Sequence, residues 1–443
     1  MDKFIINGGI PLKGEISVAG AKNVALKILV ASLLTDEEIV IHNVPQIRDV
    51  HFMLEVLREL GVESAVDGHT VRVMNTHTKD IKVPLEVGSR LRTSSMVMGP
   101  LLARYGHATT PNPGGCRLGA RPIDRHISAL RDMGADITYN SNDGYFYGKA
   151  KGLHGATVRF PKNTHTGTET LLLAGVLARG QTVLENAAEE VEIDDLIACL
   201  NMMGARVRRV EPRKIVIDGV AALHGTEYSL MPDRNEEVTF AVAAVMTGGD
   251  ILVRNSQRDN LTAFLSIFKK AGGRYQTVDA TTTRYMSDGP IRPTDIVTGQ
   301  FPGFMTDWQA PWAVFMTQAK GVSTIHETVF ESRFSYVAEL RKMGAQIEFF
   351  DPEVAKPEEF YNFNWADRVP GYHQGIRITG PAALHNAVLE INDLRAGATL
   401  VLAALCAPGV SSIHGVEQVD RGYEKIEERL RALGARIERV KEE

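Results

Sequence analysis

Cysteine is scarce in this sequence, and long apolar runs are missing. Three cysteines are spread over 443 residues, which excludes a disulfide framework and a Cys-x-x-Cys metal site. The longest apolar stretches, residues 24–34 and 398–406, fall short of the roughly 18 residues that a membrane-spanning helix needs. The opening MDKFIINGG lacks the charged-then-apolar pattern of an export signal. We therefore expect a protein of the reducing cytoplasm that does not span a membrane.

An excess of positive charge is also missing. Lysine and arginine number 49 against 54 aspartate and glutamate, and the formal net charge is -5. A protein that neutralises a nucleic-acid backbone needs a broad basic face, so this balance argues against nucleic acid as a partner. It leaves room for a local cationic pocket that binds a small anion.

The strongest pattern present is an internal repeat, a short motif around a glycine that recurs six times. Its copies read LRELGVES, LRDMGADI, LNMMGARV, FKKAGGRY, LRKMGAQI and LRALGARI, with glycines Gly61, Gly134, Gly204, Gly272, Gly344 and Gly434. Successive glycines are 73, 70, 68, 72 and 90 residues apart by subtraction. A period of about 70 residues is too long for a solenoid of helical hairpins and indicates one compact subdomain per copy.

Each copy predicts the same run of elements. The repeated motif closes an amphipathic helix with its glycine at the C′ position, and a strand follows. Upstream lies a helix that is apolar nearly all round, such as VTFAVAAVMTGG, and such a helix should be buried. The sequence therefore predicts an α/β fold in which every copy reads strand, buried helix, strand, outer helix, strand. A chain of this length exceeds what one core usually serves, so we expect two domains of three copies, divided near residue 228 by a cleft, with helices inside and sheets outside.

The second copy is longer than its siblings between its two helix-ending glycines. Copies three to six span 24, 24, 23 and 25 residues there, whereas copy two spans 28, from Gly106 to Gly134. The extra residues fall in TPNPGGCRLGARPID, a loop rich in proline and glycine that holds Cys116. Loops of this kind tend to carry function.

Cys116 differs from the other two cysteines in its surroundings. Cys199 and Cys406 lie in apolar helical segments and should be inert core residues. Cys116 follows two glycines and precedes Arg117 and Arg121, and nearby guanidinium groups favour the thiolate. Composition alone leaves a reactive and a structural role for Cys116 equally open.

The sixth copy carries a second addition, because its spacing of 90 residues exceeds the others by about 20. The excess is DPEVAKPEEFYNFNWADRVPGYH, residues 351–373, in which five aromatic residues lie among acidic residues and prolines. An ordered surface excursion pinned by its aromatic residues is the favoured interpretation. A partner contact or a lid is the alternative.

Six motifs in order carry a family resemblance over essentially the whole chain. GAKNVALKILVASLL, PGGCRLGARPIDRHI, TDWQAPW, ETVFESRF, NDLRAGATLVLA and DRGYEKIEERLRALGA together resemble the enolpyruvyl transferase family, in particular its members that act on UDP-N-acetylglucosamine. The resemblance implies two inside-out α/β domains, residues 22–228 and residues 1–21 with 229–443, the N-terminal strand returning to the second domain. It also implies transfer of the enolpyruvyl group of phosphoenolpyruvate to the sugar 3-hydroxyl through a tetrahedral phospho-ketal, with release of phosphate and with neither a metal nor an organic cofactor. This reaction is the first committed step of peptidoglycan precursor synthesis.

The resemblance also implies roles for individual residues. Cys116 would be the general acid that protonates C3 of phosphoenolpyruvate, and it can attack C2 as a nucleophile. Asp307 would be the base for the sugar hydroxyl, and Arg333 and Asp393 would orient these groups. The implied catalytic residues are Cys116, Asp307, Lys22 and Arg395; the implied phosphoenolpyruvate contacts are Lys22, Asn23, Arg121, Arg395 and Arg421; and the implied nucleotide-sugar contacts are Asn23, Arg92, Arg121, Pro122, Ile123, Asp124, Arg125, Lys162, Asn163, Thr164, His165, Asp307 and Val329.

Three segments depart from the family. FPKNTHTGTETL stands where the family usually shows a Ser-Val-Gly-Ala-Thr stretch that contacts the diphosphate, and here Thr164 can supply a hydroxyl and Lys162 a cation. His165 either helps to bind the diphosphate or is a solvated histidine. PDRNEEVTF also departs, and Gln418 stands where a histidine is common. These changes leave a different acceptor, such as shikimate 3-phosphate or another nucleotide, as the alternative substrate.

A different class of protein stays open as well. A non-enzymatic repeat scaffold, or a protein that processes nucleic-acid ends, can share such a repeat. The acidic balance and the two motifs around Cys116 and Asp307 argue against both. The PGGC loop favours the UDP-sugar branch, because the shikimate branch lacks it.

Overall fold

The chain divides into two units, each with its own hydrophobic core. A computed structural model describes residues 2–441 except 77, 79–80, 116–117 and 120–121. The first unit contains the described residues of Met1–Ala19, Cys116–Arg121 and Pro232–Glu443, and the second contains those of Gly20–Gly115 and Pro122–Met231.

Every copy of the repeat contributes one inner and one outer helix. The inner helices are α1 (Lys22–Ala31), α4 (Met98–Tyr105), α6 (His165–Gly175), α8 (Arg234–Met246), α10 (Gln309–Met316) and α13 (Leu394–Cys406). The outer helices are α2 (Arg48–Glu59), α5 (Asp124–Asp132), α7 (Val191–Met202), α9 (Thr262–Lys270), α11 (Val337–Lys342) and α14 (Ile426–Ala432). All residues of α8 and α10 are buried, as the uniformly apolar pattern predicted. No helix in the described part of the chain combines the length and apolarity needed to cross a membrane.

The repeated glycines end the outer helices as predicted. Gly61, Gly134, Gly204, Gly272, Gly344 and Gly434 all have φ between +93° and +97°, a conformation that costs glycine least. Each glycine N–H donates to the carbonyl three residues before it, and in five copies the next N–H reaches back five residues, as Ala205 does to Leu200 at 3.0 Å. This Schellman arrangement satisfies the last carbonyls of the helix and turns the chain into the following strand.

Copies one to five each end in a hairpin of two strands, where one strand was predicted. Copy three shows the pattern, with the outer helix α7 followed by β11 (Arg206–Glu211) and β12 (Lys214–Asp218). These strands pair antiparallel through a two-residue turn, and β12 pairs with β10 (Gln181–Glu185), which lies parallel to β9 (Thr157–Arg159). The sequence hides the second strand because the turn Pro212–Arg213 is short and polar and leaves no separate element to recognise.

The sheets follow this plan in both units. In the second unit they are β13-β3-β5-β4, β6-β8-β7 and β11-β12-β10-β9, with β3 (Ile39–His42), β4 (Glu63–Asp67), β5 (Thr70–Met74), β6 (His107–Pro111), β7 (Asp136–Asn140), β8 (Tyr145–Lys149) and β13 (Thr226–Ser229). In the first unit they are β15-β16-β14-β2, β17-β18-β20-β19 and β21-β22-β1-β23. Their strands are β1 (Asp2–Gly8), β2 (Lys13–Ser17), β14 (Asp250–Arg254), β15 (Gly273–Asp279), β16 (Thr282–Ser287), β17 (Ile296–Val297), β18 (Gly321–His326), β19 (Gln346–Phe350), β20 (Gly375–Gly380), β21 (Val388–Glu390), β22 (Gly409–His414) and β23 (Arg436–Lys441).

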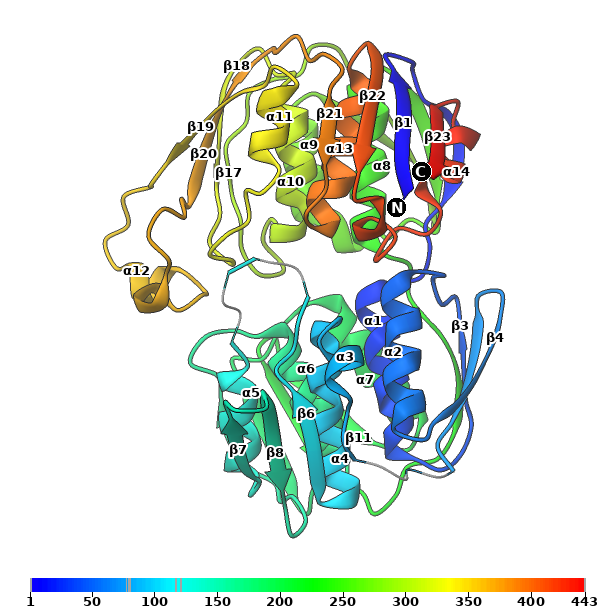
Figure 1. Ribbon diagram of the computed structural model, residues 1–443, viewed down its shortest axis with the longest axis vertical. Helices are drawn as coiled ribbons and strands as arrows, with labels where there is room; N and C mark the ends of the chain where they lie inside the picture. The colour runs from blue at the N-terminus through cyan, green and yellow to red at the C-terminus, as the bar shows by residue number, and fades with distance from the viewer. Residues whose placement is uncertain (1, 77, 79–80, 116–117, 120–121, 442–443) are drawn as a thin grey trace. The chain divides into compact units, whose positions relative to one another are not determined.

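Two strands belong to the sheet of a different copy from the inner helix that follows them in the chain. β2 precedes α1 in the chain but pairs parallel with β14 of copy four, and β13 precedes α8 but pairs parallel with β3 of copy one. The N-terminal β1 lies between β22 and β23 (Figure 1), where it completes the sheet of the sixth copy. The first strand of the chain therefore pairs with two of its last strands.

Candidate functional site

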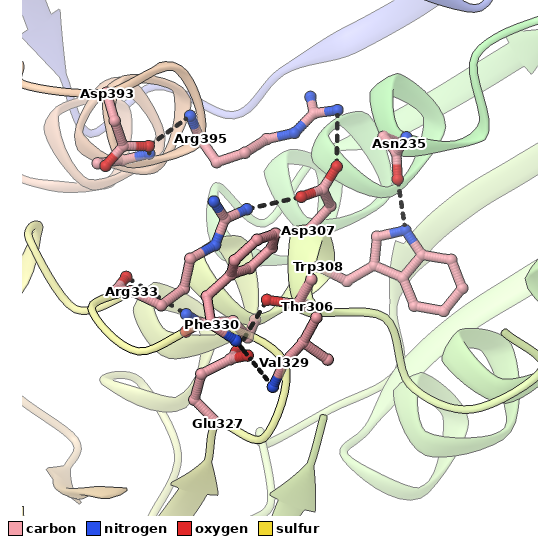
Figure 2. A network of polar contacts seen from close by, with 12 residues as sticks. Asn235, Thr306, Asp307, Trp308, Glu327, Val329, Phe330, Arg333, Asp393 and Arg395 are labelled. Atoms are coloured by element: carbon pink, nitrogen blue, oxygen red, sulfur yellow. Dashed lines mark hydrogen bonds and ion pairs between the residues drawn. The ribbon is translucent and has the colours of Figure 1, made fainter. Parts of the chain in front are cut away.

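The candidate residues named from the sequence belong to both units. Cys116 and Arg121 lie outside the described residues. In the first unit the structure brings Asp307, Arg333, Asp393 and Arg395 into one polar network (Figure 2).

Asp307 lies between two buried guanidinium groups. It is part of a short 3₁₀ turn, η4 (Thr306–Trp308), at the start of α10. Its Oδ1 accepts a hydrogen bond from Arg333 Nη2 at 2.6 Å, and its Oδ2 lies 3.4 Å from Arg395 Nη2 (Figure 2). About 24% of the Asp307 side chain is exposed, against 5% and 7% for the two arginines. Both oxygens of the carboxylate therefore lie next to a guanidinium group, while part of the side chain stays exposed.

Arg395 is fixed by the first turn of α13. Asp393 is the N-cap, and its Oδ1 accepts from the N–H groups of Arg395 and Ala396, each at 3.0 Å, which satisfies two of the open donors of the helix. Arg395 Nη1 donates to the Tyr423 hydroxyl at 3.0 Å. Burial opposes the charge of Arg395, but Tyr423, Asp307 and Asp233 outweigh it and raise the pKa of the guanidinium. Arg395 is therefore a permanent buried cation beside Asp307.

A buried carboxylate shapes the segment that carries Val329. Glu327 follows β18, and its Oε1 accepts from the N–H groups of Val329 at 2.8 Å and Phe330 at 3.0 Å. Its Oε2 accepts from the Thr306 hydroxyl at 2.9 Å, one residue before Asp307. Burial raises the pKa of Glu327, against the opposing effects of Arg333 and of these hydrogen bonds. Glu327 was not among the predicted residues, although it opens the motif ETVFESRF directly after the strand GVSTIH.

Arg421 contacts the residue that departs from the family pattern. Its Nη1 donates to Gln418 Oε1 at 3.3 Å. Gln418 ends the 3₁₀ turn η6 (Val416–Gln418). The glutamine that stands in place of the common histidine is therefore a direct partner of one of the predicted anion-binding arginines.

In the second unit, Lys22 and Asn23 begin the buried helix α1. Lys22 Nζ lies 2.6 Å from Asp49 Oδ2, and Asp49 is buried in the first turn of α2. The ion pair fixes the lysine at the N-terminal end of α1, where the helix dipole adds to its positive charge. Asp49 was another residue that the sequence analysis did not single out.

Three predicted nucleotide-sugar segments meet in the second unit. Arg92 begins the 3₁₀ turn η2 (Arg92–Val97) and donates to the carbonyl of Pro122 at 3.2 Å. Arg125, in the first turn of α5, donates to the carbonyl of Asn163 at 3.3 Å. Burial lowers the pKa of Arg125, and Asp124 opposes that shift. These bonds tie residues 92, 122–125 and 163 together, with Asp124 exposed and Ile123 buried.

The departing segment begins helix α6. Thr164 is the N-cap, and its hydroxyl oxygen accepts from the N–H of Gly167 at 3.1 Å. Asn163 donates from Nδ2 to the carbonyl of Ala187 at 2.9 Å. Lys162 is half-buried beside them. Thr164 therefore satisfies one of the open N–H groups in the first turn of α6.

His165 is paired with a carboxylate inside the core of the second unit. Its Nε2 lies 3.1 Å from Glu169 Oε1, and Lys27 Nζ of α1 lies 3.3 Å from the same oxygen. Burial alone would lower the pKa of His165, but Glu169 and Glu190 outweigh it and raise the pKa to about 9, with Lys27 opposing them. The sequence offered a signal for this cluster, because Lys27 and Glu169 are charged residues within apolar helices.

A second histidine contacts the same helix in the opposite charge state. His126 Nε2 lies 2.8 Å from the hydroxyl of Thr166. Burial, Arg92 and Arg125 together lower the pKa of His126 to about 3, so its imidazole is neutral. The described residues contain no group of three or more histidine, cysteine or acidic side chains placed to hold a metal ion.

Comparison with solved structures places this fold among the enolpyruvyl transferases. The enolpyruvyl transferase NikO from Streptomyces tendae aligns with a TM-score of 0.85 and 23% identity, over 99% of both chains. EPSP synthase from Acinetobacter baumannii aligns with a TM-score of 0.72 and 20% identity, over all of both chains. At these identities the likeness establishes the fold.

Sequence comparison establishes the family. The family model described as EPSP synthase (3-phosphoshikimate 1-carboxyvinyltransferase) matches residues 6–430. The chain is 41% identical to the UDP-N-acetylglucosamine 1-carboxyvinyltransferase of Acidobacterium capsulatum, over 99% of this chain and 96% of that protein. It is 42% identical to the protein of the same name from Solibacter usitatus, over 99% of this chain and all of that protein. The chain therefore belongs to the enolpyruvyl transferase family, and within it to the group of the UDP-N-acetylglucosamine 1-carboxyvinyltransferases.

Proposed function

We propose that the protein transfers the enolpyruvyl group of phosphoenolpyruvate to the 3-hydroxyl of UDP-N-acetylglucosamine and releases phosphate. The observation that carries this proposal is the arrangement of Asp307, a partly exposed carboxylate between the buried guanidinium groups of Arg333 and Arg395. Full-length relatives that carry the name of this activity support it.

The reaction requires a base, an acid and fixed cations. Asp307 accepts the proton of the sugar 3-hydroxyl while the oxygen of that hydroxyl bonds to C2 of phosphoenolpyruvate. Cys116 delivers a proton to C3. The resulting phospho-ketal then loses a proton from C3 and expels phosphate, which restores the carbon–carbon double bond. Lys22, Arg121, Arg395 and Arg421 neutralise the phosphate and carboxylate of phosphoenolpyruvate. No redox step or cofactor enters this balance.

The two parts of the chain divide the work. Residues 22–228 carry Cys116 and the acceptor contacts, namely Asn23, Arg92, Pro122, Ile123, Asp124, Arg125, Lys162, Asn163, Thr164 and His165. Residues 1–21 with 229–443 supply the base Asp307, Val329 and the arginines Arg395 and Arg421. The contacts of Arg92, Arg125 and Thr164 described above support the first assignment. Peptidoglycan precursor synthesis in the cytoplasm is the proposed setting.

A different acceptor is the second candidate. The description of the matching family model names 3-phosphoshikimate, and the segment around Thr164 and His165 departs from the family pattern. Phosphate release by the purified protein, with phosphoenolpyruvate and either UDP-N-acetylglucosamine or shikimate 3-phosphate, decides between them. We expect phosphate release when the acceptor is UDP-N-acetylglucosamine and none when it is shikimate 3-phosphate. Release with shikimate 3-phosphate alone would replace the first proposal with the second.

A further inference from the structure

The addition at residues 351–373 lies within a hairpin that is short in the sibling copies. It leaves β19 after Phe350 and returns at Gly375 of β20, and these two residues face each other in the antiparallel pair. The corresponding hairpins of copies one, three and four turn within two residues, at 68–69, 212–213 and 280–281. The spacing of the glycines placed this addition in the sixth copy, but the structure shows that it belongs to the hairpin of copy five, because β19 follows the outer helix α11 of that copy. The strand pairing of the hairpin does not require the added segment.

The added segment has an ordered aromatic cluster of its own. Tyr361 is 1% exposed, and its ring stacks on Trp365 with centroids 4.6 Å apart and planes at 7°. The Tyr361 hydroxyl lies 3.0 Å from Nε2 of His326, the last residue of β18. The ring of Phe360 stacks on the His326 ring, with centroids 5.3 Å apart. Through these contacts the addition packs against the end of β18, the strand that leads into Glu327.

Beyond this cluster, the addition binds the segment 328–331 at the backbone carbonyl of Thr328 and at the side chain of Glu331. The N–H of Asn362 donates to the carbonyl of Thr328 at 2.8 Å. The N–H of Val369 donates to Glu331 Oε1 at 2.5 Å. Gln374, beside β20, donates from Nε2 to the Glu331 carbonyl at 3.0 Å.

Val329 is therefore fixed from two directions. The buried carboxylate of Glu327 holds the N–H groups of Val329 and Phe330, and the addition holds the residues on either side of them. Asp307 and Arg333 do not depend on the addition in the same way, because they bind each other. Loss of the contacts from residues 351–373 should loosen Val329 while leaving Asp307 in place.

We propose that residues 351–373 are a positioning element for the nucleotide acceptor, which set the place of Val329 by holding Thr328 and Glu331. This inference rests on the proposed function, in which Val329 contacts the nucleotide. A positioning element of this kind acts on the Michaelis constant for the acceptor more than on the rate at saturation, because the base and the cations keep their geometry.

A matched pair of variants at Val369 tests the proposal. Val369→Pro removes the N–H that donates to the Glu331 carboxylate, and the extended backbone of Arg368 (φ -62°, ψ 140°) already suits a following proline. Val369→Ala keeps that N–H and is the control, since Val369 is exposed. We expect Val369→Pro to raise the KM for UDP-N-acetylglucosamine about tenfold, with kcat and the KM for phosphoenolpyruvate changed less than about twofold. Val369→Ala should match the wild type.

A second pair of variants tests the aromatic cluster around Tyr361. Trp365→Ala removes the ring that stacks on Tyr361, and Trp365→Phe keeps an aromatic partner. The alanine variant should repeat the effect of Val369→Pro on the acceptor KM, and the phenylalanine variant should restore most of the affinity. Melting temperatures of all four variants separate positioning from general loss of stability.

Two results would overturn the inference. One is a Val369→Pro protein with the acceptor KM of Val369→Ala. The other is a parallel change of kcat and both KM values that follows the melting temperature. Failure of the proposed function is distinct, because the wild-type protein itself would then not turn over UDP-N-acetylglucosamine.

Discussion

Arg333 donates to Asp307 across 2.6 Å, from a guanidinium group that is buried to a carboxylate that is partly exposed. Arg395 approaches the second oxygen of the same carboxylate from the first turn of α13. The carboxylate is therefore held from two sides, and the proton-accepting role that we propose for it depends on a charge that an amide lacks.

Asp307→Asn should lower the rate of phosphate release by at least the ~10²-fold typical of a lost general base. The amide oxygen can still accept from Arg333, so we expect a folded protein that binds phosphoenolpyruvate. Asp259→Asn is the control, because the side chain of Asp259 is 95% exposed. Near-normal turnover by a folded Asp307→Asn protein would remove Asp307 from the role of base.

Cys116 should be the one cysteine that an electrophile modifies at neutral pH. Burial raises the pKa of Cys199 to about 12, with a smaller effect of Asp195, and burial raises the pKa of Cys406 to about 11. Both therefore stay as thiols, which are poor nucleophiles. We expect fosfomycin, an epoxide phosphonate that resembles phosphoenolpyruvate, to alkylate Cys116, and more quickly when the nucleotide sugar is present.

Peptide mass mapping of the treated protein locates the adduct. Cys116→Ser should lose most of its turnover, since a hydroxyl is a far poorer acid than a thiol, while Cys199→Ser should remain active. An adduct on Cys199 or Cys406, or full activity of Cys116→Ser, would show that the loop cysteine has been misassigned.

His165 should make the stability of the protein depend on pH. Its folded-state pKa of about 9 lies above the unfolded value of about 6.5, because Glu169 and Glu190 favour the charged form. The stabilisation is fully present below about pH 6.5 and is lost as the pH rises through about 9, by about 1.4 kcal/mol for each pKa unit of the shift. Lys27 keeps Glu169 paired at high pH.

Urea unfolding of His165→Gln measures this effect. The variant should be less stable than the wild type at about pH 6 and should approach it at about pH 10. His224→Ala, which replaces an exposed histidine of the same unit, should follow the wild type at both. A wild-type advantage over His165→Gln that stays constant with pH would exclude a charged His165.

Thr164 should contribute to stability through its N-cap. Thr164→Ala removes the acceptor for the N–H of Gly167 and should cost about 1 kcal/mol of unfolding free energy. Thr164→Ser keeps the hydroxyl and should cost much less. Thermal unfolding of the two variants compares them, and equal melting temperatures would contradict the capping role.

Much of the fold was predictable because local rules decide it. The six glycines that end the outer helices adopt the left-handed conformation expected of them, and the apolar segments of α8 and α10 are buried as expected. The exchange of β2 and β13 was not predictable from the repeat alone, since each pairs with a strand more than 180 residues away by subtraction. Short strands carry no local signal of their distant partners.

The polar contacts were harder to foresee than the residue types. Motifs placed Asp307 and Arg395 among the candidates. Glu327 opens a quoted motif, but the motif alone does not show that its carboxylate binds the backbone of Val329, and no motif contains Asp49, the partner of Lys22. Both act through contacts between elements far apart in the sequence. His165 was left open between a ligand contact and a solvated side chain, and its pairing with Glu169 shows that it is not simply solvated.

The structure of the reaction product tests the central claim most directly. Purified protein should be incubated with phosphoenolpyruvate and UDP-N-acetylglucosamine, and the product examined by proton NMR alongside inorganic phosphate. The account predicts a vinyl ether on the sugar 3-oxygen, formed in equal amount to the phosphate released. An unchanged nucleotide sugar, in a protein that converts shikimate 3-phosphate under the same conditions, would contradict it.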